Sequence, residues 1–295
     1  MITVIVCSVN KGLLEKLRSN IAATIGVEYE MLVTDNSIGQ RSIAAVYNEA
    51  GAKAGFPFLC FVHEDVIIHT KGWGQEIINL LGQKDIGLLG ISGAVYKSAY
   101  PGSWSTCHPS LYRTNSIQHF AGQPAPVVTD ANPEKATAIP VAVIDGVFMA
   151  TTKTIFDQYR FDEQLLKGFH CYDIDYAMQV GQTHKVMVSY GLLLEHLSEG
   201  QLTRDWLKDS MAVHKKWKKQ LPLKTVAIDP AIKKESDYRA CASVLSIALK
   251  SRGNKKLVMH YYRLLLFSFF SFNKLKYTKS VLRYLFMNAL KQVHG

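Results

Sequence analysis

Three polar side chains with the chemistry of metal ligands stand directly after an apolar run. The run, Phe58 to Val62, has the composition of a buried strand, and His63, Glu64 and Asp65 follow it at once. Polar groups at the end of a buried strand are costly unless a partner satisfies them, and open α/β sheets bind ligands at that end. Asp65 is the expected ligand of a Mg²⁺ or Mn²⁺ ion that meets a phosphorylated molecule, and His63 is compatible with Mn²⁺. A capped strand–helix junction is the alternative.

Two further acidic residues open a predicted helix in the run YDIDYAMQV. Asp173 and Asp175 are two residues apart and therefore point to different faces of that helix. One of them can face the site as a general base while the other caps or anchors the helix. The alternative is that both only stabilise the positive end of the helix dipole. His196 ends a later apolar strand, a position that favours sharing a metal with Asp65, although a lone histidine is more often a core or surface group.

A third polar cluster, Asp35, Asn36 and Ser37, follows the second predicted strand. An acidic residue at this position can accept a hydrogen bond from a ribose hydroxyl or a base edge. The same residue types also favour turns and helix N-caps, which is the alternative for this cluster.

Alternating strands and helices must position these residues. Hydrophobic periodicity and turn residues predict βαβ units, a mostly parallel sheet and right-handed connections, so the fold class is α/β. The predicted strands are Thr3–Cys7, Tyr29–Val33, Phe58–Val62 and Ile86–Ile91, and the predicted helices are Lys11–Ile25, Arg41–Ala54 and Gly72–Leu81.

The pattern lapses from Lys97 to Ala138, a stretch rich in Ser, Thr, Pro, Gly and aromatic residues. Its length and aromatic content predict a folded insertion that faces a ligand. Order then returns, and the chain is predicted to be all-helical from about Asp229. The elements predicted in between are a strand at Ile139–Ile144, a helix at Tyr172–Gln182, a strand pair over Lys185–His196 broken at Tyr190-Gly191, and a helix at Arg204–Lys219.

Composition restricts the class of protein. The 295 residues are 48% hydrophobic and 20% charged, which is typical of a globular protein with a sizeable core. The five cysteines are scattered without a CxxC pair, which disfavours a zinc ribbon or a disulfide framework and favours a reducing compartment. The N-terminus reads as a strand and not as a signal peptide, and no apolar run reaches the length of a membrane span. We therefore expect a cytoplasmic protein.

The formal net charge of +10 is concentrated at the C-terminus. No acidic residue follows Asp237, and that tail carries eleven Lys and Arg, whereas the preceding residues carry 23 Lys and Arg against 24 Asp and Glu. The segment Lys255 to Phe272 combines these charges with an apolar run, which is typical of a helix lying in a membrane interface. The alternative is a helical subdomain packed on the rest of the chain. Nucleic-acid binding is disfavoured because no recognised motif accompanies the charge.

The chain contains no GxSxG, Walker A, HExxH or GxGxxG motif. From Thr3 to about Pro222 it resembles GT-A glycosyltransferases, especially those of family 2, because its polar clusters occur in the same order. TVIVCSVN resembles the first nucleotide-binding strand, LVTDNSIGQRSIAAVYNEAGAKA the nucleoside-contacting segment, and FVHEDV the DxD motif. DGVFMATTK resembles the acceptor-side strand, FHCYDIDYAMQV the start of the helix with the catalytic base, and LEHLSEGQ with KKWKKQLP the closing histidine segment and its helix.

The resemblance implies a role for each matched residue. It implies that Asp173 is the catalytic base and that Asp65 and His196 hold the divalent cation, Mn²⁺ or Mg²⁺. Two matched positions depart from the family pattern, since His63 replaces the first DxD carboxylate and Tyr172 replaces the usual Glu before the base. The residues implied to line the donor site are Ser8, Asp35, Asn36, Asn48, His63, Glu64 and Asp145.

The implied activity is inverting transfer of a hexosyl or N-acetylhexosaminyl group from a nucleotide-diphosphate donor to a hydroxyl of a glycan or lipid-linked acceptor. The expected donor is a UDP-sugar. That activity belongs to cell-surface polysaccharide synthesis. The expected architecture is a GT-A (Rossmann-like) sheet flanked by helices over residues 1–225 and a basic helical extension over 226–295. A homodimer and a peripheral position on the inner membrane face are further expectations. The alternative is a non-catalytic nucleotide-sugar-binding or scaffold module. A sugar nucleotidyltransferase is disfavoured because Ser8 to Gly12 lacks its Gly-rich signature loop.

Overall fold

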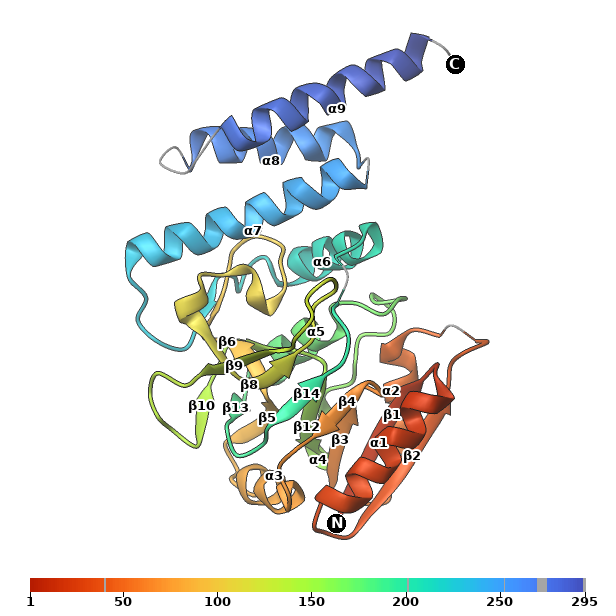
Figure 1. Ribbon diagram of the computed structural model, residues 1–295. Helices are drawn as coiled ribbons and strands as arrows, with labels where there is room; N and C mark the ends of the chain where they lie inside the picture. The colour runs from red at the N-terminus through yellow and green to blue at the C-terminus, as the bar shows by residue number, and fades with distance from the viewer. Residues whose placement is uncertain (40, 201, 252, 270–274, 294–295) are drawn as a thin grey trace.

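The computed structural model describes residues 1–39, 41–200, 202–251, 253–269 and 275–293. A large central sheet and a second, mixed sheet lie in the body of the molecule, with helices packed around them (Figure 1). The C-terminal helices stack in layers at the end of the molecule opposite the N-terminus, as Figure 1 shows.

The central sheet contains most of the buried strands. In the described part of the chain it has seven strands in the order β10-β13-β5-β12-β3-β1-β2. Five of them run in one direction, while β12 and β10 run antiparallel to their neighbours. The start of β12 therefore lies at the same edge as the end of β3. The strands are β1 (Ile2–Ser8), β2 (Tyr29–Asp35), β3 (Phe58–Val62), β5 (Ile86–Gly90), β10 (Ala138–Pro140), β12 (Phe148–Thr152) and β13 (Lys185–Ser189).

Alternation along the strands gives this sheet two apolar faces. Val4 and Val6 of β1 enter one buried cluster with residues of α1 and α3, and Ile5 enters the other with residues of α2, α4 and α5. Side-chain caps fix where three of these helices begin, since Asn10, Ser42 and Thr152 each accept hydrogen bonds from the first turn. The helices are α1 (Lys11–Thr24), α2 (Ile43–Lys53), α3 (Trp73–Leu81), α4 (Lys153–Gln158) and α5 (Tyr172–Val180).

A second, mixed sheet was not predicted from the sequence. It runs β11-β6-β8-β14-β4, with β9 paired to β8. Its buried face carries hydroxyl groups in place of an apolar alternation: Ser92 contacts Thr114 at 2.6 Å, and Ser116 contacts Thr129 at 2.9 Å. The strands are β4 (Val66–Ile68), β6 (Ser92–Ala94), β8 (Tyr112–Gln118), β9 (Val127–Ala131), β11 (Val143–Ile144) and β14 (Leu194–His196).

The C-terminal helices share a core with the sheet. Buried side chains from α6, α7, α8 and α9 belong to the same apolar cluster as Ile5 of β1. A buried carboxylate reinforces the contact, because Asp237 of α7 accepts hydrogen bonds from Tyr96 at 2.8 Å and Ser98 at 2.6 Å. The domain boundary near residue 225 stays a prediction. These elements are α6 (Arg204–Trp217), α7 (Pro230–Lys250), α8 (Lys255–Phe267), α9 (Leu275–Val293), and the strand pair β15 (Leu223–Lys224) with β7 (Tyr96–Lys97).

The alternating pattern of the first 91 residues agrees with the structure to within a few residues at each end. The insertion from Lys97 to Ala138 is folded into β8, β9 and two short 3₁₀ turns, η1 (Trp104–Thr106) and η2 (Pro109–Leu111). The strand predicted at Ile139–Ile144 is instead two strands, β10 and β11, because the chain passes there from one sheet to the other. For the same reason β13 and β14 do not pair with each other. Within the described residues, no helix is long and apolar enough to cross a membrane.

Candidate functional site

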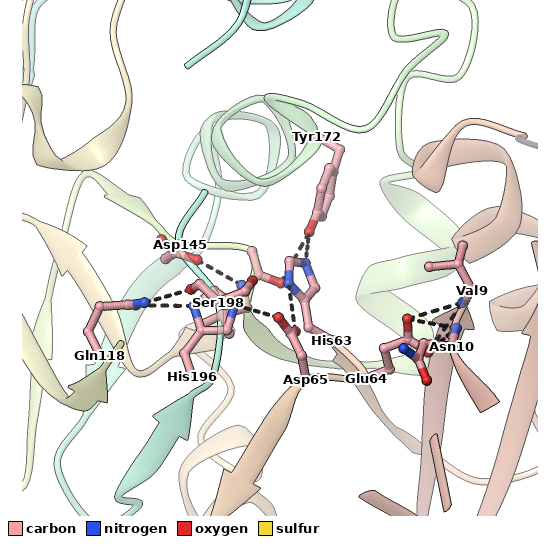
Figure 2. Close-up of polar contacts among 12 residues, drawn as sticks. Val9, Asn10, His63, Glu64, Asp65, Gln118, Asp145, Tyr172, His196 and Ser198 are labelled. Carbon is pink, nitrogen blue, oxygen red and sulfur yellow. Dashed lines mark hydrogen bonds and ion pairs between the residues drawn. The ribbon is translucent and has the colours of Figure 1, made fainter. Parts of the chain in front are cut away.

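Three side chains from separate elements meet at one edge of the central sheet. His63 follows β3 and Asp65 precedes β4, while His196 ends β14 and lies opposite Val66 in the antiparallel β14–β4 pair. This register places His196 Nε2 3.4 Å from Asp65 Oδ2, and His63 Nδ1 lies 4.0 Å from Asp65 Oδ1. One ligand atom from each residue lies within 4.8 Å of the other two (Figure 2). The three form a candidate metal centre, called the HDH cluster below.

Hydrogen bonds outside the HDH cluster orient both histidine rings. Tyr172 Oη lies 3.2 Å from the carbonyl of Gly146, to which it donates, and 2.7 Å from His63 Nε2, from which it therefore accepts. The neutral His63 ring then directs the lone pair of Nδ1 toward Asp65. On the other side, His196 Nδ1 lies 3.1 Å from Oε1 of Gln118, whose amide nitrogen donates to two backbone carbonyls. A neutral His196 therefore carries its proton on Nδ1 and leaves Nε2 available to a metal.

The donor set fits a divalent transition ion. Two imidazole nitrogens and one carboxylate oxygen suit Mn²⁺ better than Mg²⁺, which prefers oxygen ligands. Burial opposes ionisation of Asp65, but the hydrogen bond and charge of protonated His196 outweigh it and hold the pKa of Asp65 below its ordinary value. Burial also lowers the pKa of His196, but Asp65 outweighs it and raises that pKa, so a metal would bind His196 with release of a proton. Burial and the neighbouring His196 lower the pKa of His63, which favours the neutral ring that a metal requires.

A pair of carboxylates lies beside the HDH cluster. Asp173, in the first turn of α5, accepts hydrogen bonds from the backbone N–H of Gly146 at 3.0 Å and Ile174 at 2.8 Å. Asp145, in the turn before β12, accepts from the N–H of Val147 at 2.8 Å and from Nε1 of Trp104 at 2.5 Å. Burial, and then the charge of Asp145, raise the pKa of Asp173 to about 7. A partly exposed carboxyl group with this pKa has the properties of a general base near neutral pH.

Asp175, the second acidic residue at the start of α5, has a different environment from Asp173. Asp175 is fully buried and accepts hydrogen bonds from Trp217 Nε1 at 2.7 Å, Lys216 Nζ at 2.9 Å and Gln179 Nε2 at 2.8 Å. Because Lys216 and Trp217 end α6, this carboxylate fastens α6 to α5. The two acids thus point to different faces of α5, one into the site and one into the core.

Replacing Asp175 with alanine is expected to cost about 3 kcal/mol of unfolding free energy, because it leaves the buried indole N–H and part of the ammonium charge without a partner. Urea denaturation followed by circular dichroism measures this loss. Asp85→Ala is the matched control, since it removes an exposed ion pair with Lys185 and should cost less than about 1 kcal/mol. Equal losses in the two variants would contradict the role of Asp175.

Glu64 points away from the HDH cluster toward the end of β1 (Figure 2). Its carboxylate accepts from Ser8 Oγ at 2.6 Å and from the backbone N–H of Val9 and Asn10 at 3.1–3.2 Å. Ser8 is itself 4% exposed. These two predicted donor-site residues therefore hold the β1–α1 turn at the sheet edge, and direct contact with a donor stays a prediction for both.

Three further predicted donor-site residues, Asp35, Asn36 and Asn48, form hydrogen bonds with other groups of the chain. Asp35, at the end of β2, accepts from the N–H and Oγ of Ser37 at 3.0 and 2.5 Å, and these bonds lower its pKa. Asn36 is 1% exposed, and its amide bonds the backbone of Arg41 in both directions. Asn48 of α2 does the same with the backbone of Phe161. Asp35 is exposed at the sheet edge, whereas the amides of Asn36 and Asn48 hold the backbone of Arg41 and Phe161 in place. None of the three residues belongs to the HDH cluster.

Two residues that hold the site in place, Gly146 and Gln118, were not predicted from the sequence. Gly146 accepts the Tyr172 bond and donates to Asp173, and a Cβ at this position would lie 2.4 Å from Tyr172 Oη. The Asp-Gly pair before a strand was the available signal for it. Gln118 orients His196 but lies in a polar stretch without periodicity, which gave no signal.

Comparisons with known proteins identify the fold. The family model described as "Glycosyltransferase like family" matches residues 3–211. Among solved structures, GalNAc-T7 with UDP, GalNAc and Mn²⁺ is similar at a TM-score of 0.54 and 10% identity, covering 89% of this chain and 54% of that one. Mannosyltransferase PcManGT from Pyrobaculum calidifontis, in complex with GDP-Man and Mn²⁺, is similar at 0.50 and 12%, covering 99% and 86%. The chain thus spans about half the length of GalNAc-T7. A search of curated proteins finds no match. The predicted GT-A fold is confirmed.

Proposed function

This chain belongs to the glycosyltransferase-like family, and from that premise we propose that it transfers a sugar, with inversion, from a nucleoside-diphosphate donor to a hydroxyl group. The observation that carries the proposal is the position of Asp173. A carboxyl group with a pKa of about 7 lies at the sheet edge that also holds the HDH cluster. A base and a candidate cation site at one edge are the two elements that such a transfer needs.

The reaction can be written with the residues of this chain. Asp173 accepts the proton of the acceptor hydroxyl while that oxygen bonds to the anomeric carbon of the donor sugar. The bond from the anomeric carbon to the diphosphate oxygen breaks, and the nucleoside diphosphate leaves with the electron pair. Displacement from the face opposite the leaving group inverts the anomeric centre and requires no nucleophile from the protein. The N–H groups of Gly146 and Ile174 keep the Asp173 carboxylate in one orientation.

The leaving group requires compensation of its growing negative charge. His63, Asp65 and His196 would hold a divalent ion, for which Mn²⁺ is the proposal, and that ion would supply the positive charge. The orientations given to the rings by Tyr172 and Gln118 support this assignment. The donor is proposed to be a UDP-sugar and the acceptor a glycan or lipid-linked hydroxyl, in polysaccharide synthesis.

Asp145 and Trp104 are proposed to bound the sugar side of the site. Their hydrogen bond joins the turn before β12 to the insertion, and the Trp104 ring is partly exposed. An indole ring presents an apolar face on which a sugar ring can stack, and Asp145 can accept from sugar hydroxyls. The insertion would then close over the donor and shape the acceptor site.

A thermal-shift panel of UDP- and GDP-sugars, each with and without Mn²⁺, tests the proposal. A cognate donor at about 100 times its Kd should stabilise the protein by about 2.7 kcal/mol, and more strongly with Mn²⁺ than without it. Slow release of free nucleotide from that donor would then identify an enzyme and not a binding module. The proposal is wrong if no nucleotide sugar raises the Tm in either condition.

A further inference from the structure

The outermost helix of the C-terminal layers has one face that none of the other described elements covers. Lys279, Leu282, Arg283 and Phe286 follow each other at helical spacing on α9, and all four are exposed. Leu282 is 61% exposed and Phe286 is 64% exposed, whereas Val281 on the opposite side of the helix is 1% exposed and packs into the core. The four residues are called the α9 outer face below.

The preceding helix repeats this arrangement. Lys256, His260, Arg263 and Phe267 form an exposed row along α8, and Phe267 is 79% exposed. Val258, Tyr261 and Leu265 of the same helix are buried against the rest of the chain. Helix α8, the described helical part of the sequence segment Lys255–Phe272, thus packs Val258, Tyr261 and Leu265 inward and leaves cations and a large aromatic ring outside. Residues 270–272 of that segment lie outside the described residues.

The cations of these rows have no Asp or Glu partner in the described part of the chain. All Asp and Glu residues of the chain precede residue 238, and all lie among the described residues. Within that described part, the Lys and Arg side chains of the α8 and α9 rows form no ion pair: Lys256, Arg263, Lys279 and Arg283. Exposed apolar groups between unpaired cations fit a partner that is both anionic and apolar.

We propose that the α8–α9 layer docks the protein on a bilayer that contains anionic phospholipid. Lys and Arg would lie at the headgroups, while Leu282, Phe286 and Phe267 would enter the boundary between headgroups and acyl chains. A protein partner fits less well, because Lys is depleted from the centres of protein interfaces. A nucleic acid would satisfy the cations but not the aliphatic Leu282. The proposal goes beyond the proposed function and stands independently of it.

Flotation of the full-length protein with vesicles tests the docking surface. We expect binding to vesicles with about 30% phosphatidylglycerol, weaker binding to pure phosphatidylcholine, and loss of binding as salt rises from about 0.1 to 0.5 M. The double variant Lys279→Glu/Arg283→Glu should lower the partition coefficient at least about tenfold. Leu282→Ser/Phe286→Ser should also lower it, through lost apolar burial.

The matched control reverses two exposed, unpaired lysines on the catalytic body, Lys16→Glu/Lys84→Glu, and should change the partition coefficient by less than about twofold. Circular dichroism and the Tm establish that each variant is folded. The proposal is overturned if the protein does not float with anionic vesicles, or if the control lowers binding as much as Lys279→Glu/Arg283→Glu. It is equally overturned if the variants of the α9 outer face abolish self-association or duplex DNA binding while flotation stays unchanged.

Discussion

Replacing Asp173 with asparagine is expected to lower kcat by about 10²- to 10⁴-fold, the contribution of a positioned general base. An amide cannot take the proton of the acceptor hydroxyl. Its size is preserved, and its carbonyl oxygen can keep one of the two hydrogen bonds that Asp173 accepts from the N–H groups of Gly146 and Ile174. Steady-state kinetics with the donor found by thermal shift and its acceptor measure the effect. Donor affinity should change little, so the loss should fall on kcat.

Asp157→Asn is the control for this substitution, because the ion pairs of Asp157 within the described residues are with partly exposed Lys153 and Arg160 on the protein surface. It should leave kcat within about twofold, as expected for a surface substitution. Full transferase activity in Asp173→Asn would show that Asp173 is not the base.

The same carboxylate sets the direction of the pH dependence. A base works in its ionised form, so kcat/KM should rise with pH through about 7 and level off above it. Besides burial, the charge of Asp145 raises this pKa, and Asp145→Asn should therefore shift the rising limb to lower pH.

Replacing Asp65 with alanine is expected to weaken Mn²⁺ binding at least tenfold and to abolish the effect of Mn²⁺ on nucleotide binding. Asp65 supplies the single carboxylate of the HDH cluster, and the two imidazoles that remain carry no negative charge. Even the outer partners of metal ligands contribute about 10- to 100-fold in affinity, so removal of a ligand should cost no less. Calorimetry with Mn²⁺ alone, and then with UDP in its presence, measures both effects without an activity assay.

Glu64→Gln is a sharp control because it changes the adjacent carboxylate, which holds the β1–α1 turn. This variant should lose stability but keep its Mn²⁺ affinity. The metal assignment is wrong if the affinity for UDP is the same with and without Mn²⁺ and Asp65→Ala does not change that affinity.

The sequence predicted the sheet edge that carries the candidate site, because the polar clusters there follow strands with strong apolar patterns. Phe58–Val62 is a strand with the predicted bounds, and the polar residues after it lie at the sheet edge. Parallel strands end at the same edge of a sheet, so Ser8, Asp35 and His63 all lie at that edge. This placement does not depend on the contacts that their side chains form.

The second sheet could not be predicted in the same way. β8 reads YRTNSIQ, and its stability comes from hydroxyl contacts and pairing with distant strands, which leave no apolar period. The proximity of Asp65 and His196 was expected from the strand-end position of His196 and from the family resemblance. The β14–β4 register that produces it is a long-range property that local sequence does not show. Local sequence also could not show that the side-chain amides of Asn36 and Asn48 form hydrogen bonds with backbone groups.

The Trp104–Asp145 hydrogen bond has a practical consequence, because it gives the site an optical signal of its own. The chain has four tryptophans, and Trp73, Trp206 and Trp217 are at most 8% exposed. Trp104 is the partly exposed one, and its indole N–H donates a hydrogen bond to the carboxylate of Asp145. If the donor sugar binds at Trp104 and Asp145 as proposed, it would change the surroundings of this partly exposed indole. Its fluorescence emission would then report donor binding without a labelled substrate.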